Sequence, residues 1–351
     1  MPLIAQLSVV NGRTWNNMTD LPHTSTEKTW HALVLGRAGL DLYPQPDGGK
    51  TSDAHGFSAD MGGSGGNIAA AMGCAGAKVA LLSAVSDDAI GHFVRQRLKQ
   101  YHVSDAFLQT SQGNSRTSLA IAEVRPTDCD VVIYRNDAAD LQLCLTDAMQ
   151  TAVSNSNNLV VTGTALISEP SRTTSLELMQ QAKSNGCTVW LDLDYRPWNW
   201  PDLQTTRTIY GLAAQHANVV IGNEEEFAVL TDQLEDYIQQ ANLPTSAHTT
   251  GQAILLKRGG HGASLFNQGQ RLDTGVYPVT PLKPYGAGDA FLGNLVHHYN
   301  SHHDWQAAIA CGSAAAAIVV SQRGCASAMP NAEQINLMQK SATMTPAANW
   351  Y

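Results

Sequence analysis

The chain has 351 residues, of which 43% are hydrophobic and 15% are charged, and its formal net charge is −9. This length and apolar content suit one large α/β domain with a small appendage and exclude a disordered chain. The negative charge argues against a nucleic-acid partner, which needs a basic surface, but a few Arg residues can still bind a small acid.

Residues 1–30 are polar and without periodicity, and we expect them to form an extension outside the core. They lack the basic and apolar regions of a secretory signal. No apolar run in the chain reaches the roughly 18 residues that a membrane helix needs, so no membrane contact is expected. The six Cys are scattered without a Cys-x-x-Cys pair, which argues against zinc and a disulfide framework. We therefore expect a cytoplasmic protein with reduced cysteines.

The first third of the core alternates apolar segments with glycine-rich turns. Residues 31–36 and 78–85 predict buried strands. Residues 67–77 predict a buried helix because they are rich in Ala and Gly, and residues 88–101 predict a helix with one apolar face.

A small β lid is predicted next to this core. Residues 118–124 and 130–135 alternate as two strands joined by a turn that contains Pro. Residues 39–46 leave the first strand, and their prolines argue against a regular central strand. We expect the lid to be built from about 43–61 and 114–137.

Strand and helix patterns alternate through the rest of the chain. The predicted strands are 158–163, 188–194, 219–222 and 253–257, and the predicted helices are 171–185, 288–300 and 305–321. Such alternation predicts a largely parallel sheet covered by helices on both faces, with ligands at the carboxyl ends of the strands. We expect one domain over 31–340 and a C-terminal tail over 341–351.

The most informative motif is Gly-Ala-Gly-Asp at residues 286–289, which opens a predicted helix. Unpaired N–H groups at a helix N-terminus bind anions, and small residues let a phosphate come close. An Asp beside a transferring phosphoryl group can accept the proton of the attacking hydroxyl. The alternative is that Asp289 only caps the helix, and the motif alone does not decide between the two.

A glycine cluster at residues 62–67, Gly-Gly-Ser-Gly-Gly-Asn, precedes the first predicted helix. Glycine lets the backbone approach a small polar ligand, and Asn67 can both donate and accept. The cluster does not fit the dinucleotide fingerprint, because Ile68 stands where the last Gly belongs, which argues against an NAD-dependent oxidoreductase. The alternative is a flexible glycine turn.

Two further motifs follow predicted strands. Asn223 and Glu226 lie on one face of a predicted helix start, and a carboxylate near nucleotide phosphates usually holds Mg²⁺. The turn that begins at Lys257 and contains Gly259 and Gly262 can expose N–H groups to phosphates. Taken alone, the acidic segment is more typical of a charged helix start, and the glycine turn is equally typical of an ordinary β-turn.

The order of the four motifs resembles the PfkB/ribokinase family over residues 31–335. The resemblance implies a ribokinase-like α/β fold: a doubly wound, mainly parallel sheet with helices on both faces and a small β lid. It also implies ATP as phosphoryl donor and Mg²⁺ as metal. By position, the residues expected at the sugar are Asp41, Gly63 and Asn67. Those expected at the nucleotide are Asn223, Glu226, Lys257, Gly259 and Gly262, with Glu226 serving the metal. Gly286, Ala287 and Gly288 are expected to form an anion hole, and Asp289 is expected to be the base.

One departure from the family pattern precedes the anion hole. Lys283-Pro284 stand where the family usually has Asp-Thr. The departure argues against a monovalent-cation site of the kind that some members carry, and Lys283 can itself supply positive charge there.

Polar residues at predicted strand ends point to an acidic sugar. The candidates are Arg116, Tyr134, Arg135, Asp194 and Arg196. Arg forms bidentate pairs with carboxylates. The alternative is that the Arg residues make structural ion pairs, with Asp140 or Asp194 as partners. These strand ends resemble the sugar-acid branch of the family.

Five segments make the resemblance within that branch more specific: 36–45, 134–140, 163–164, 191–197 and 283–289. It implies transfer of the ATP γ-phosphoryl group to the terminal hydroxyl of 5-dehydro-2-deoxy-D-gluconate. Alternatives are 2-keto-3-deoxygluconate as acceptor or another sugar kinase of the same family. A more remote alternative is a non-catalytic sugar-acid sensor on the same fold, which would be expected to lose Asp289 or its glycines. The expected partners are the sugar acid and ATP, and a homodimer through the lid stays open.

Overall fold

The computed structural model describes residues 28–243 and 251–347, so the expected extension at 1–30 falls almost wholly outside the described part. A ten-stranded sheet runs through the centre of the molecule. Its strands in spatial order are β14 (Gln270–Thr274), β13 (Ala263–Asn267), β12 (Ala253–Lys257), β11 (Val219–Gly222), β10 (Thr188–Asp192), β9 (Ser156–Thr162), β1 (Trp30–Leu35), β4 (Val79–Val85) and β5 (Val103–Ser104), with β6 (Leu108–Thr110) beside β4.

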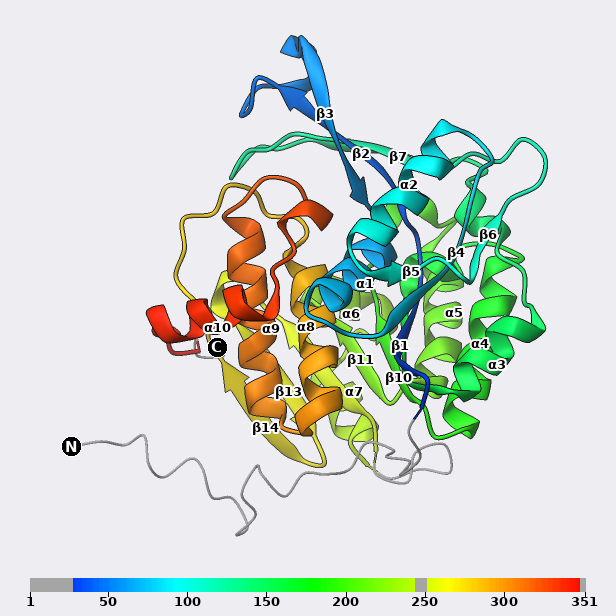
Figure 1. Cartoon of the computed structure of the whole chain (residues 1–351). Coiled ribbons are helices and arrows are strands. Elements are labelled where there is room, and N and C mark those ends of the chain that lie inside the picture. Colours follow the sequence, from blue (N-terminus) through cyan, green and yellow to red (C-terminus); the bar gives the residue numbers. More distant parts are fainter. Residues whose placement is uncertain (1–27, 244–250, 348–351) are drawn as a thin grey trace.

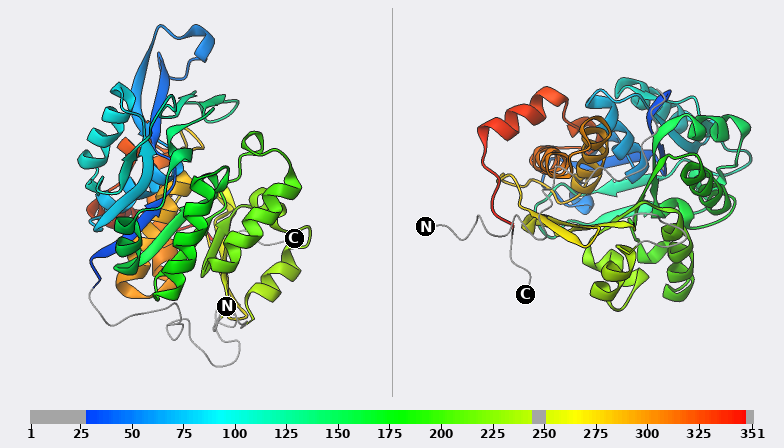
Figure 2. Two further views of the ribbon diagram at one scale, coloured as in Figure 1. Left: turned by 90° about the vertical axis from the view of Figure 1, so that its right-hand side faces the viewer. Right: turned by 90° about the horizontal axis from the view of Figure 1, so that it is seen from below.

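The strands from β12 to β5 are parallel, and the edge strands β13 and β14 are antiparallel. Helices cover both faces of the sheet (Figures 1 and 2). One face carries α1 (Ser64–Cys74), α8 (Ala287–His302) and α9 (Trp305–Val320), with α2 (Ala89–Gln100) and α10 (Ala332–Ser341) at its margins. The other face carries α3 (Asp147–Ser154), α4 (Ser171–Ser184), α5 (Leu203–His216), α6 (Glu224–Leu230) and α7 (Leu234–Ala241).

Alternation along the strands explains this arrangement. In β1, Ala32 and Val34 pack against the α1, α8 and α9 face, while Leu33 and Leu35 pack against the opposite face. Because both faces are covered, the residues from Ala32 to Leu35 are all apolar and buried, as is usual in parallel sheets. The predicted doubly wound, mainly parallel sheet is confirmed. Among the described residues, none of the helices combines the length and the hydropathy that crossing a bilayer requires.

A second sheet of four strands stands at the carboxyl edge of the first, at the top of Figure 1. Its order is β3 (Gly56–Gly62), β2 (Gly39–Gln45), β7 (Leu119–Ala122) and β8 (Val131–Tyr134). The predicted pairing of the segments at 118–124 and 130–135 is confirmed by the antiparallel β7–β8 ladder. We call this four-stranded sheet the lid.

The expectation that prolines keep residues 39–46 out of a central strand is wrong. Strand β2 has neighbours on both sides and begins at Gly39, earlier than the expected start of the lid at residue 43. The pairing with β7 covers only Leu40 to Leu42, so Pro44 lies beyond it and pairs with β3 alone. A proline is tolerated there because one side of the strand has no ladder to complete.

The glycine cluster is also not a loop. Gly65 and Gly66 lie inside the first turn of α1, which begins three residues before the predicted start at Asn67. A Cβ on Gly65 would come within 2.6 Å of the backbone carbon of Gly36. These glycines therefore allow α1 to pack directly on the chain that leaves β1.

The inner end of the lid is tied to the core by a buried carboxylate. Asp60 in β3 accepts hydrogen bonds from the Tyr101 hydroxyl, from the backbone N–H groups of Cys325 and Ser327, and from the Ser327 hydroxyl, at 2.7–3.2 Å. The outer residues of β3, including Phe57, are exposed. The Asp60 carboxylate anchors the inner end of the lid. The outer part also contacts the core, because the Tyr285 hydroxyl donates to the Glu123 carbonyl oxygen at 2.7 Å and Arg323 pairs with Asp47.

Candidate active site

Polar side chains from several elements meet at the carboxyl edge of the central sheet. Asp192 ends β10, Lys257 ends β12, and Asp194 follows β10 by two residues. Asn67 from α1 and Asp289 from α8 approach from the helical layer. Parallel strands all end at this edge, so residues far apart in sequence converge there.

Asp289 lies in the first turn of α8, and its carboxylate faces Asn67. The Asn67 Nδ2 donates to Asp289 Oδ2 at 2.8 Å. Burial raises the pKa of Asp289 to about 7, and the neighbouring carboxylate of Asp194 acts in the same direction, while the bond from Asn67 opposes it. A carboxyl group with a pKa near neutrality can both accept and release a proton at physiological pH.

The turn before Asp289 has the backbone shape of an anion site. Gly286, the N-cap of α8, has a φ of 82°. A Cβ added at Gly286 would lie 3.0 Å from the Cys325 sulfur. The N–H groups that open the helix at Ala287, Gly288 and Asp289 have no partner further back within it. Together with the helix dipole they favour a bound anion.

Lys257 lies beside this turn and is paired with buried carboxylates. Its Nζ is 2.9 Å from Asp192 Oδ1 and 3.6 Å from Glu226 Oε2, and 3.6 Å from the position of a Cβ on Gly288. Burial alone would lower the pKa of Lys257, but the two carboxylates outweigh it and raise the pKa. Burial raises the pKa of Asp192 to about 6, and Lys257 opposes that shift. The amine therefore carries a positive charge next to the anion site.

Asn223 and Glu226 form a reciprocal cap at the start of α6. The Glu226 N–H donates to Asn223 Oδ1 at 2.8 Å, and the Asn223 N–H donates to Glu226 Oε2 at 2.7 Å. In the described residues there is no cluster of three or more His, Cys, Asp or Glu side chains that could hold a metal. The single carboxylate of Glu226 still suits Mg²⁺, because Mg²⁺ is usually held by one or two carboxylates together with substrate phosphates.

The glycine turn after β12 is a tight reversal into β13. Gly259 and Gly262 have φ values of 54° and 95°, and a Cβ on Gly262 would lie 1.9 Å from the Thr274 carbonyl oxygen. The turn begins at Lys257 and so lies close to the anion site. A side chain at Gly262 would clash with the sheet, whereas Gly259 has open space around it.

Asp194 is the centre of a second polar group. It forms an ion pair with Arg196 at 2.7 Å and accepts hydrogen bonds from the hydroxyls of Ser64 and Thr164. Sequence analysis selected Asp194 and Arg196 but missed Ser64 and Thr164. Ser64 lies within the glycine cluster and Thr164 directly follows Gly163 at a predicted strand end, and those positions were the only available indication.

Arg135 is buried and held by the protein itself. It pairs with Asp140 and donates to the Thr164 carbonyl oxygen at 2.8 Å. Its Nη1 and the Asp140 Oδ1 are buried without a hydrogen-bond partner. The ion pair with Asp140 that sequence analysis left open is therefore present, with one guanidinium nitrogen still available to a ligand.

Arg116 and Tyr134 are placed differently from the other candidates. The Arg116 side chain is 63% exposed and lies 3.9 Å from Asp88, and Tyr134 is 58% exposed on β8. Their contacts do not join the cluster around Asp289, so the structure does not bring them together with the other candidates.

Asp41 and Gly63 line the connection between the core and the lid. Asp41 is buried, and its Oδ1 has no hydrogen-bond partner. Burial raises the pKa of Asp41 to about 6, with Arg37 opposing the shift. Gly63 has a φ of 91°, and a Cβ there would lie 2.6 Å from the Arg37 carbonyl oxygen. An unpaired buried carboxylate oxygen is a group that a ligand hydroxyl can satisfy.

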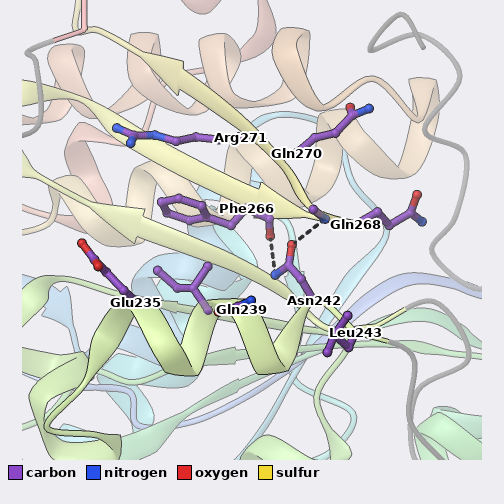
Figure 3. Close-up of a pocket in the computed structure, with 10 residues that line it drawn as sticks. Glu235, Gln239, Asn242, Leu243, Phe266, Gln268, Gln270 and Arg271 are labelled. Carbon is purple, nitrogen blue, oxygen red and sulfur yellow. Dashed lines mark hydrogen bonds between the residues drawn. The ribbon is translucent and has the colours of Figure 1, made fainter. Parts of the chain in front are cut away.

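A large pocket lies away from this cluster. It measures about 860 Å³ and lies between α7 and the hairpin of β13 and β14 (Figure 3). Asn242 at its floor donates to the Phe266 carbonyl oxygen and accepts from the Gly269 N–H. None of the residues that line it is a predicted site residue.

The chain is similar to known proteins over most of its length. Residues 31–332 match the family described as pfkB family carbohydrate kinase. A protein of Photobacterium profundum named 5-dehydro-2-deoxygluconokinase is 38% identical over 309 residues, which cover 86% of this chain and 92% of that protein. One of Lacticaseibacillus casei with the same name is 33% identical over 86% of this chain and 93% of its own length. The crystal structure of fructokinase with bound ATP from Xylella fastidiosa has a similar fold, with a TM-score of 0.76 at 21% identity over 88% of this chain and 98% of that one.

Proposed function

This chain belongs to the pfkB family of carbohydrate kinases, and we propose that it transfers the γ-phosphoryl group of ATP to the terminal hydroxyl of 5-dehydro-2-deoxy-D-gluconate. The observation that carries the proposal is the pairing of Asp289 with the N-terminus of α8, where a carboxyl group with a pKa of about 7 lies beside an anion site. The identity of the acceptor is proposed from the name of the relatives at 33–38% identity.

In the proposed reaction Asp289 accepts the proton of the attacking hydroxyl. Asn67 holds the carboxylate in place through its 2.8 Å hydrogen bond. The N–H groups of Ala287, Gly288 and Asp289 bind the charge that develops on the transferring phosphoryl group. A fixed donor at such a position typically contributes about 10²–10³-fold to turnover.

Lys257, Glu226 and Asn223 are proposed to serve the nucleotide. Lys257 carries a positive charge 3.6 Å from the Cβ position of Gly288, where it can neutralise a phosphate oxygen. Glu226 is the candidate ligand for Mg²⁺ through water, and Gly259 and Gly262 shape the turn beside it. When bound, Mg²⁺ neutralises phosphate charge.

The acceptor is proposed to lie between the Asp194 group and the lid. Arg196 and the free Nη1 of Arg135 are candidates for its carboxylate, with Asp41 and Gly63 for its hydroxyl end. Arg116 and Tyr134 remain proposed lid contacts that would require the lid to move. The lid excludes water that would otherwise hydrolyse ATP.

The alternatives have less support. The two relatives described above are named after 5-dehydro-2-deoxygluconate and not after the rival acceptor, 2-keto-3-deoxygluconate. A sensor without catalysis has no reason to keep a buried carboxylate of raised pKa beside an anion site. Association through the lid stays a proposal, with Phe57, Val131 and Val132 as exposed apolar residues of that sheet.

The acceptor assignment is tested by ADP release from purified protein. We expect the highest kcat/KM on 5-dehydro-2-deoxygluconate, because a site built for one hydroxyl pattern leaves buried polar groups unpaired with another, and such mismatches can reach about 10⁴-fold. Ribose, fructose and adenosine serve as neutral controls. Higher kcat/KM on 2-keto-3-deoxygluconate would move the chain to the rival acceptor, and preference for a neutral sugar would refute the sugar-acid proposal.

Replacing Arg196 tests the carboxylate contact. The Arg196→Met variant should raise KM for the acid by about 10–100-fold, because charge-assisted hydrogen bonds of an Arg to a carboxylate are lost. The corresponding sugar alcohol, which has no carboxylate, should show little change. Arg207→Met, which removes an Arg from an ion pair with the exposed Asp232, is the matched control. Equal losses on acid and alcohol would exclude the proposed contact.

A further inference from the structure

Lys283 is a fully buried lysine in the loop that leads into α8. Its side chain is 0% exposed, and its Nζ donates to the Tyr285 carbonyl oxygen at 2.8 Å. The same nitrogen lies 5.2 Å from the centre of the Tyr285 ring. A charged amine is rarely buried without a compensating interaction, because removing it from water has a large cost in solvation free energy.

The surroundings of Lys283 act on its charged form in both directions, and burial outweighs the nearby acidic groups, so the pKa of Lys283 is lowered. Burial lowers the pKa of Lys283, whereas the carboxylates of Asp289, Asp60 and Asp41 act in the opposite direction. An ammonium group has three donors, and among the described residues one oxygen accepts from it. This lysine is thus not a member of a closed ion pair.

The Tyr285 carbonyl oxygen, which accepts the hydrogen bond from Lys283, lies next to the anion-binding turn. Tyr285 directly precedes Gly286, the N-cap of the anion-binding turn. The Leu282 and Lys283 N–H groups donate to the Val320 carbonyl oxygen at 2.7 and 3.3 Å, which fixes the start of the same loop to the end of α9. The ammonium therefore holds the last carbonyl before the turn, and its charge lies close enough to Asp289 to affect it.

A backbone carbonyl in a buried loop is the type of oxygen that binds K⁺, where carbonyls replace the water shell of the ion. An ammonium is also monovalent and also binds carbonyl oxygens. We propose that Lys283 is a positioning residue whose ammonium serves as a built-in monovalent cation beside the anion-binding turn, so that phosphoryl transfer by this chain requires no free K⁺. This inference rests on the proposed kinase function.

The first test is cation dependence of the wild-type protein. Turnover in K⁺, Na⁺ or choline chloride at one ionic strength should agree within about twofold, because the charge is part of the chain. Activation by K⁺ of more than about tenfold over choline would overturn the proposal, because a built-in charge leaves no role for a bound ion.

The second test removes the lysine. Lys283→Met keeps the volume and loses the charge, and it should lower kcat by at least about tenfold with a smaller change in KM for ATP, because the positioned donors lose their geometry. Lys283→Ala leaves space, so K⁺, ammonium or methylammonium should restore turnover, and choline should not. Lys340→Ala on the exposed end of α10 is the matched control. Full kcat in Lys283→Met, or an alanine variant that folds but responds to none of the small cations, would overturn the proposal.

A third measurement needs no acceptor and separates this inference from the proposed function. Binding of a non-hydrolysable ATP analogue is measured by calorimetry with and without K⁺. The dissociation constant of the wild type should not change, and that of Lys283→Ala should become dependent on K⁺. If every acceptor fails while these results hold, the function is wrong and the role of Lys283 stands. If the wild type binds the analogue more tightly with K⁺, the role of Lys283 is wrong whichever acceptor is used.

Discussion

Asp289→Asn should reduce kcat by about 10²–10⁴-fold while ATP binding is retained, because general-base catalysis is lost and the backbone N–H groups stay in place. The amide keeps the size of the carboxyl and can still face Asn67. The measurement is steady-state ADP release together with calorimetric ATP binding. Turnover near that of the wild type would remove Asp289 from the mechanism.

The pH dependence provides an independent check of the same residue. A base acts only when it is deprotonated, so kcat/KM of the wild type should fall as the pH drops below the pKa of Asp289, about 7, and level off above it. The raised pKa also means that the ionised carboxylate destabilises the folded state above about pH 4. The Asn variant should therefore be at least as stable as the wild type at about pH 8, and this difference should vanish near pH 4.

Lys257→Met should lower kcat by about 10²-fold or more, because a positive charge beside the anion site is lost. The variant also leaves Asp192 and Glu226 buried without their partner, so some loss could come from local repulsion. The double variant Lys257→Met, Asp192→Asn separates the two causes. Recovery of kcat in the double variant would show that Lys257 only neutralises Asp192, whereas a persistent loss supports direct action on the phosphates.

Local sequence patterns were sufficient for the main sheet and for the positions of the motifs. The apolar strands are each bounded by Gly or polar residues, and a parallel arrangement brings their carboxyl ends together, so Asp194, Asn223 and Lys257 could be expected at one edge. The anion site stays a prediction, because Gly-Ala-Gly-Asp at a helix start is equally typical of a helix cap and only the order of the four motifs favoured anion binding.

Contacts between distant segments could not be predicted in the same way. The bonds from Ser64 and Thr164 to Asp194 depend on how α1 docks on the sheet, and the pattern of a single chain carries no such distance. The sequence placed the helix start at Asn67 and not at Ser64, because glycines that allow close helix packing cannot be distinguished by sequence from glycines that precede a helix. Helices α3, α5, α7 and α10 and the hairpin of β13 and β14 were not predicted, although α3 and α7 each have a distinct apolar face.

The anchoring of the lid at Asp60 determines how it can move. In β3 the residues from Asp60 to Gly62 are buried and bonded to the core, whereas Phe57 to Ala59 are exposed. Such a sheet does not rotate as a rigid body about a hinge, because its base is bonded to the core. It can close by bending along the length of β2 and β3, with the largest displacement at the tip. Backbone amides near Asp60 should therefore exchange hydrogen slowly and those near Phe57 rapidly, so that rigidity is graded along a single strand.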